Sequence, residues 1–157
     1  MKLAEALALR SDAQKRLAQL QARAVASARS QEGEEPPERA EELLAEARAV
    51  TDEIEGLVRR INRTNASTQL ALGLTITDAI AQRDTLALRR KLVTAVADAA
   101  VGGDERRGWG RQLRSELRQL TELPVGELRR EADDIARRYR ELDVRVQEVN
   151  WATELVE

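Results

Sequence analysis

Polar side chains that could bind a ligand or support acid–base chemistry gather at the ends of the helical segments that this sequence predicts. The densest set lies in "RRINRTNASTQLALGLTITDAIAQRD", residues 59–84, and a smaller one in the C-terminal "NWATELVE". Converging carboxylate, guanidinium and amide groups can bind a small polar ligand or a cation. They can equally form a buried hydrogen-bond network or a polar subunit contact. The candidate residues are Arg10, Asn62, Arg63, Asn65, Asp78, Arg83, Asp84, Asn150 and Trp151.

The residue types that are missing exclude most other chemistry. The chain has no Cys and no His, so it lacks the usual metal ligands, the Cys nucleophile and the commonest general base. Acidic pairs at helical spacing occur in "READD" (130–134) and "AEELLAE" (40–46), but such spacings are inevitable in a chain with 28 acidic residues. We therefore assign no catalytic residue, no metal ligand and no cofactor, and we do not expect an enzyme.

The candidate residues must be positioned by long helices, because the composition is rich in Ala, Leu, Glu and Arg and almost lacks aromatic residues. Helical patterns cover residues 2 to about 30 and about 37 to 66. A third follows the capping box "TITD" (75–78) and runs to about 100, and a fourth begins near Pro124 and ends at "NWATELVE". Two of them carry narrow apolar seams at alternating spacings of four and three residues. The first seam is Leu43, Ala47, Val50, Ile54, Leu57 and Ile61; the second is Leu128, Ala132, Ile135, Tyr139, Leu142, Val146 and Val149.

The connections between these segments predict the topology. "SQEGEEPPE" (30–38) is short and contains Gly33, so the first two helices should fold back as a long antiparallel hairpin. "TQLALGLTIT" (68–77) alternates around Gly73 and predicts a small β-hairpin. Residues 111–125 are compatible with either a helix or a strand. We predict one all-α domain over residues 1–157: an antiparallel bundle of about four helices, with minor β structure near 68–76 and 113–123.

In such a bundle, the start of the first helix, the end of the second, the start of the third and the end of the fourth meet at one end. All nine candidate residues should then lie near this polar end of the bundle.

Charge and hydropathy restrict the partners. The net charge is −2, and the Arg-Arg pairs are interleaved with acidic residues, so we expect no nucleic-acid binding. No apolar run is long enough for a transmembrane helix or a signal peptide, which predicts a cytoplasmic protein without membrane contact. Because seams of heptad width usually pack against another helix, we expect a homo-oligomer. The predicted function is a self-associating interaction or scaffold protein. The alternative is binding of a small polar ligand, of unknown identity, or a cation at the polar end.

Four stretches, "MKLAEALALR", "RINRTN", "TITDAIAQRD" and "LDVRVQEVNWATELVE", resemble a small family of bacterial proteins often labelled septicolysin. The resemblance covers nearly the whole chain. It departs at Leu72-Gly73, where the family has an Asp-Gly turn, and at "ELRQLTEL" (116–123), where the family has a more β-branched and aromatic run. The label implies a pore-forming cytolysin, but thiol-activated cytolysins are larger, β-rich and Trp-rich at the membrane. We therefore transfer neither that activity nor any functional residue.

Overall fold

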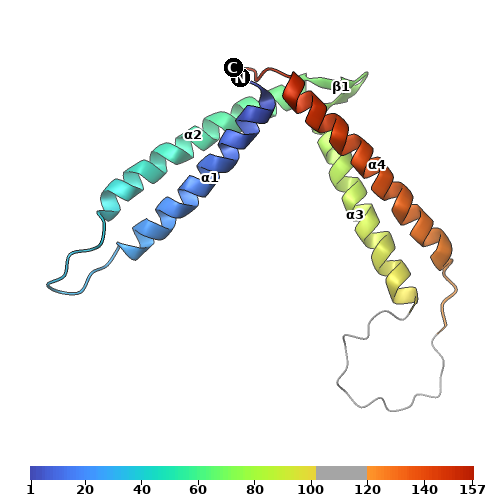
Figure 1. The fold of residues 1–157 in the computed structure, drawn as a ribbon, viewed down its shortest axis with the longest axis horizontal. Helices are drawn as coiled ribbons and strands as arrows, with labels where there is room; N and C mark the ends of the chain where they lie inside the picture. Colours follow the sequence, from blue (N-terminus) through green and yellow to red (C-terminus); the bar gives the residue numbers. More distant parts are fainter. Residues whose placement is uncertain (102–119) are drawn as a thin grey trace, which may run out of the picture. The chain divides into compact units, whose positions relative to one another are not determined.

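The computed structural model describes residues 1–101 and 120–157, and within them the chain is almost entirely helical (Figure 1). The elements in chain order are α1 (Leu3–Ala26), α2 (Ala40–Ser67), β1 (Gln69–Ala71), β2 (Leu74–Thr75), α3 (Ile76–Ala100) and α4 (Val125–Ala152). This confirms the all-α class, the four helices and the β-hairpin predicted near 68–76. Of the β segment predicted near 113–123, residues 113–119 lie outside the described residues, and residues 120–123 form neither helix nor strand.

The chain divides into two compact units. Unit 1 consists of Met1–Thr77 and Gln147–Glu157, and unit 2 of Asp78–Val146. Unit 1 therefore contains α1, α2, the β-hairpin and both chain termini. Unit 2 contains most of α3 and α4.

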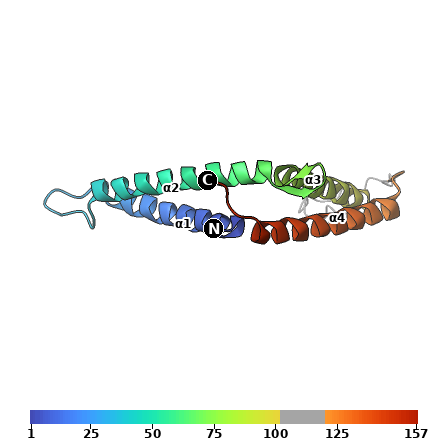
Figure 2. The same cartoon turned by 90° about the horizontal axis from the view of Figure 1, so that it is seen from above.

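Helices α1 and α2 form the predicted antiparallel hairpin and lie side by side in two perpendicular views (Figures 1 and 2). The seam of α2 packs against small and large apolar residues of α1, in a core built from Ala13, Leu20, Ala24, Leu43 and Val50. Gly33 turns the connection with a φ of 89°, a backbone conformation that side-chain-bearing residues rarely adopt. The α2 seam is thus covered within the chain, which corrects our expectation that it joins subunits.

Ion pairs along the edge of the hairpin support this register. The guanidinium group of Arg16 bonds to Glu53, and Nε of Arg23 donates to Oε2 of Glu38 over 2.9 Å. The hydrogen bond to Glu38 is the main cause that raises the pKa of Arg23, and the same bond lowers the pKa of Glu38. Because these groups are exposed, the pairs select the register of the helices more than they stabilise it.

The β-hairpin links α2 to α3. Gln69 pairs with Thr75 and Ala71 with Leu74, and the turn contains Gly73 with a φ of 74°. The amide of Gly73 donates to the side-chain oxygen of Gln69 over 3.2 Å. The hairpin therefore sets the place where α2 ends and α3 begins.

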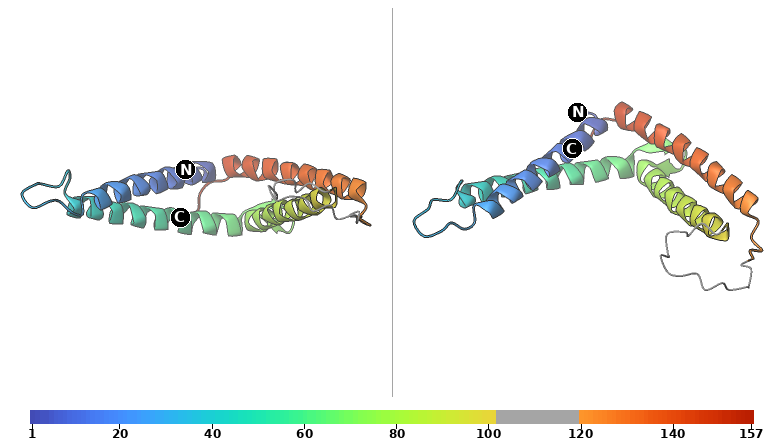
Figure 3. Two further views of the ribbon diagram at one scale, coloured as in Figure 1. Left: turned by 90° about the horizontal axis from the view of Figure 1, so that it is seen from below. Right: turned by 60° about the horizontal axis from the view of Figure 1, so that its bottom comes forward.

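In unit 2, α3 and α4 lie side by side, as the views in Figures 1 and 3 show. The seam of α4 is buried at Ala132, Ile135, Leu142 and Val146, all of which belong to unit 2. This second seam is also used inside the chain. The surfaces that the sequence suggested for self-association are therefore core surfaces of a single chain.

Candidate functional site

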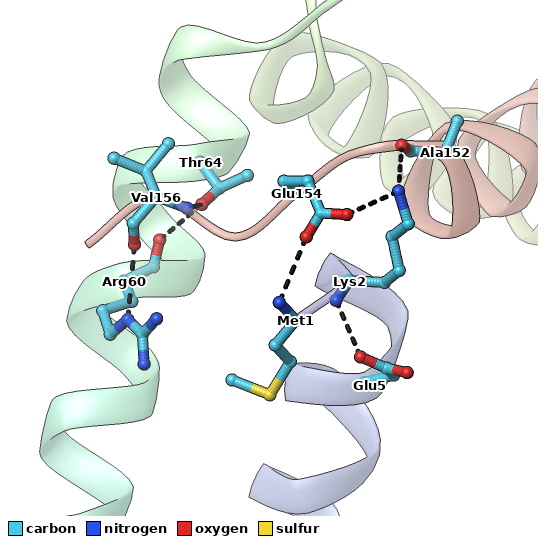
Figure 4. A network of polar contacts seen from close by, with 8 residues as sticks. All are labelled: Met1, Lys2, Glu5, Arg60, Thr64, Ala152, Glu154 and Val156. Carbon is cyan, nitrogen blue, oxygen red and sulfur yellow. Dashed lines mark hydrogen bonds and ion pairs between the residues drawn. The ribbon is translucent and has the colours of Figure 1, made fainter.

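The two chain termini are joined by a network of polar contacts in unit 1 (Figure 4). Lys2 and Glu154 form an isolated antiparallel β-bridge, in which the amide of Leu3 donates to the carbonyl of Thr153 over 3.0 Å. The carboxylate of Glu154 accepts Nζ of Lys2 at 2.7 Å and the terminal ammonium of Met1 at 3.1 Å. The hydrogen bond from Lys2 is the largest of the contributions that lower the pKa of Glu154, followed by the terminal ammonium.

The C-terminal tail continues along α2, where Thr64 holds it. Thr64 is fully buried, and its hydroxyl accepts the amide of Val156 at 3.0 Å while donating to the carbonyl of Arg60 at 2.8 Å. Arg60 in turn donates from Nε to the carbonyl of Val156 over 3.3 Å. Two residues one helical turn apart thus supply an acceptor and a donor to the backbone of Val156.

Of the nine candidate residues, unit 1 contains Arg10, Asn62, Arg63, Asn65, Asn150 and Trp151, and unit 2 contains Asp78, Arg83 and Asp84. Asn62 and Arg63 are exposed on α2, and Arg63 donates to the carbonyl of Glu157 over 3.4 Å. Asn65 is half-buried. Near the end of α4, Asn150 is only 6% exposed, whereas Trp151 is 63% exposed.

Arg10 lies on α1 seven residues after the buried Leu3 and three before the buried Ala13, where an apolar residue would continue the same face. Its side chain is half-buried, and its Nε atom is buried without a hydrogen-bond partner within the part of the chain that the structure describes. An unsatisfied buried donor costs free energy, so an added acceptor that reached this nitrogen would stabilise unit 1. No other nitrogen or oxygen of a buried or half-buried side chain in the described ranges is left in this state.

In unit 2, Arg83 bridges two helices. It donates from Nη1 to Asp143 of α4 over 3.1 Å and from Nη2 and Nε to Asp84 over 3.0 and 3.1 Å. Burial opposes the charge of Arg83, but the hydrogen bonds to Asp84 and Asp143 outweigh it and raise its pKa. The third candidate of this unit, Asp78, lies exposed in the first turn of α3.

In the terminal network and in the Arg83 bridge, the polar side chains are paired with one another within the chain. Within residues 1–101 and 120–157, no group of three or more acidic side chains is placed to hold a metal ion. Sequence reasoning missed Lys2, Thr64 and Glu154, which carry the terminal network. The hydroxyl of Thr64 lies inside the motif "RINRTN", and its seam position, three residues after Ile61, was the available signal.

A second feature that the sequence analysis missed is an apolar ridge on α3. Leu88 is 69% exposed, Leu92 is 65% exposed, and Val96 continues the same face one turn later. On a helix, the half-buried Val93 and the buried Ala97 lie about 100° and 140° around the axis from Leu92, the middle residue of this set. We call the residues Leu88, Leu92 and Val96 the α3 ridge. The signal was the spacing of four residues between them.

Another apolar surface lies on the α1–α2 hairpin of unit 1. A groove of about 360 Å³ runs between the two helices near their connection, and it is lined almost wholly by apolar atoms. Val25 and Leu44 on its walls are exposed. Among the described residues, no helix is both long and apolar enough to cross a membrane.

Comparison with known proteins relates the whole chain to one group. The model of a family of unknown function (DUF6847) matches residues 10–155. The chain is also similar to a functionally unknown conserved protein from Corynebacterium diphtheriae, whose crystal structure aligns with a TM-score of 0.91 and 41% sequence identity over 99% of each chain. No curated protein matches the sequence.

Proposed function

We propose that this chain, which belongs to the family of unknown function DUF6847, is a self-associating interaction protein whose subunits meet through the α3 ridge. The observation that carries the proposal is the exposure of Leu88 and Leu92, at 69% and 65%, on a helix whose other side already packs in the chain. A helix with apolar residues on two sides is usually packed against other protein surfaces on both of those sides.

The companion helix supports this interpretation by contrast. The outer side of α4 carries ion pairs, in which Arg137 bonds to Asp134 at 2.9 Å and approaches Glu141 at 4.0 Å. Within unit 2, Val144 is the one large apolar residue exposed on that side of α4; Trp151, on the same face seven residues later, belongs to unit 1. Two helices of one unit thus differ: α4 has the charged outer side of a solvated helix, and α3 does not.

Burial of the ridge contributes favourable free energy to association. Covering a leucine side chain fully is worth about 1.5–3 kcal/mol. Two leucines and a valine from each of two subunits would offset part of the entropy lost when the subunits associate. The association should therefore be moderate in strength and sensitive to a single charge on the ridge.

Light scattering coupled to size exclusion, at micromolar concentrations, tests the proposal. The wild-type protein should elute as an oligomer, and Leu92→Glu should elute as a monomer with unchanged helical circular dichroism. Val144→Glu is the matched control on the charged side of α4 and should leave the oligomer intact. A monomeric wild-type protein would refute self-association, and an oligomer broken only by Leu44→Glu would move the interface to the groove of the α1–α2 hairpin.

A second candidate function is binding of a small anion or other polar acceptor at Arg10. It is favoured by the buried Nε atom without a partner among the described residues. A thermal-shift screen with phosphate, carboxylates and nucleotides should then raise the melting temperature of the wild type but not of Arg10→Met. Equal shifts in both proteins, or none, would leave Arg10 without a ligand role.

A further inference from the structure

We infer that the self-association proposed above is an antiparallel pairing of α3 with α3 of a second copy, in a register set by Lys91 and Asp98. This inference rests on the proposed function and adds the orientation and the charged contacts. It follows from two observations on the outer side of α3: the distribution of large and small residues, and the charges beside the ridge.

The first observation is that large and small residues are segregated along this face. Leu88 and Leu92 lie in its middle, whereas the positions that continue the heptad spacing towards the C-terminus are Ala95 and Ala99. A parallel pair would place leucine on leucine and alanine on alanine, which gives one wide and one narrow stretch. An antiparallel pair places each leucine against an alanine, so that the spacing of the helices stays uniform.

In that register Leu88 faces Ala99 of the second copy and Leu92 faces its Ala95. The two-fold axis then passes between residues 93 and 94, and all three ridge residues are covered, including Val96. The other antiparallel register, in which Leu88 faces Thr85 and Leu92 faces Ala81, is centred nearer the N-terminus and leaves Val96 uncovered.

The second observation concerns the charges beside the ridge. Asp84, Lys91 and Asp98 are spaced by seven residues and therefore form one row along the same flank of α3. Asp84 is already bonded to Arg83 at 3.0 Å. Lys91 and Asp98 form no ion pair within the described part of the chain.

In an antiparallel pair of identical helices, each flank faces the same flank of the other copy. The register centred near residue 93 brings Lys91 opposite Asp98 of the second copy, twice by symmetry. The register centred nearer the N-terminus would instead use Asp84, which has an internal partner. Size, coverage of the ridge and charge thus select the same register.

Charge reversal tests the contacts by sedimentation equilibrium. Lys91→Glu and Asp98→Lys each convert two attractive pairs into two repulsive ones, and each should raise the dissociation constant about tenfold at low salt. The double variant Lys91→Glu/Asp98→Lys should restore the wild-type value. Restoration by Asp84→Lys/Lys91→Glu instead would overturn the register proposed here.

Cysteine cross-linking tests the orientation, since the natural chain contains no cysteine. Mixed Leu88→Cys and Ala99→Cys proteins should form a disulfide-linked heterodimer under oxidation. Ala99→Cys alone should not link to itself, because its two copies would lie about 16 Å apart along the axis, at about 1.5 Å per residue, beyond the reach of a disulfide. Self-linking of Ala99→Cys would show a parallel pair.

These outcomes separate the two proposals. A monomeric wild type refutes self-association and the register together. An oligomer that Leu92→Glu dissociates, but that the charge reversals leave unchanged, keeps the α3 interface and refutes the register.

Discussion

The hydroxyl of Thr64 and the amide of Val156 are joined by a hydrogen bond of 3.0 Å across a sequence separation of 92 residues. The bond ties the C-terminal tail to the last turns of α2. Because Thr64 also donates to the carbonyl of Arg60, its hydroxyl uses both its donor and an acceptor position in one buried place. This single side chain explains why a polar residue occupies the seam of α2 next to Ile61.

Replacement of Thr64 by Val should destabilise unit 1. The shape is nearly unchanged, but the amide of Val156 loses its acceptor, and losing a partly buried hydrogen bond costs about 0.5–1.5 kcal/mol. Urea unfolding measures the loss, and hydrogen exchange at Val156 should accelerate. Thr51→Val is the matched control, because the hydroxyl of Thr51 only donates to the carbonyl of Arg48 on an exposed face. An equal loss in both variants would contradict the role of the tail contact.

Stability should fall at acid pH partly through Glu154. Lys2 and the terminal ammonium lower the pKa of Glu154 in the folded chain below its unfolded value. The contribution is therefore present above the unfolded pKa of about 4.3 and is lost as the pH falls through the folded pKa. A carbon-detected titration of the Glu154 carboxyl group gives the folded value directly.

The variant Glu154→Gln should have a lower melting temperature at neutral pH and a shallower fall below about pH 5. Glu148→Gln, an exposed residue of α4 outside this network, serves as the control and should keep the wild-type profile. A wild-type profile in Glu154→Gln as well would show that the terminal network does not contribute.

The bridge from Arg83 to Asp143 should show measurable coupling in a double-mutant cycle. Both side chains are partly buried, at 24% and 35% exposure, so the coupling between Arg83→Gln and Asp143→Asn should be about 1 kcal/mol. The exposed pair of Arg137 and Asp134 is the matched comparison, with an expected coupling of about 0.3–0.5 kcal/mol. Chemical unfolding of the four proteins in each cycle gives both values, and coupling no larger for the bridge would contradict its role in joining α3 to α4.

Two glycines should respond to alanine in opposite directions. Gly73 has a φ of 74° in the hairpin turn, so Gly73→Ala should destabilise by about 1–2 kcal/mol through backbone strain. Gly56 lies within α2, and a Cβ added there meets no atom within 4 Å. Gly56→Ala should therefore stabilise by about 0.5–1 kcal/mol, the helix propensity difference. Thermal unfolding compares the two, and a loss of stability in Gly56→Ala would show an unrecognised contact at that face.

Much of the fold was predictable because local patterns decide it. The seam from Leu43 to Ile61, the break at Gly33 and the alternation around Gly73 each carry a signal within a few residues. The structure places helices and hairpin within a few residues of those predictions. For the nine polar candidates, the sequence predicted only that they lie near the ends of helices. It did not predict their partners.

Burial and pairing could not be predicted in the same way, because they depend on residues far apart in the chain. No local sequence pattern around Thr64 predicts its contact with Val156, and none around Arg83 predicts its contact with Asp143. The exposure of Leu88 and Leu92 is also a tertiary property, because a leucine in a helical sequence gives the same pattern whether its side chain is buried or exposed.

The sequence by itself determined the four long helices, their turns and the absence of Cys and His chemistry, because propensity and periodicity act locally. Only the tertiary structure decided that both heptad seams are buried within the chain. It also decided that Met1 and Lys2 pair with Glu154, and that the α3 ridge stays exposed. The physical reason is that a side chain is buried only when two surfaces come into contact. The sequence of a single helix does not specify which of its faces makes that contact.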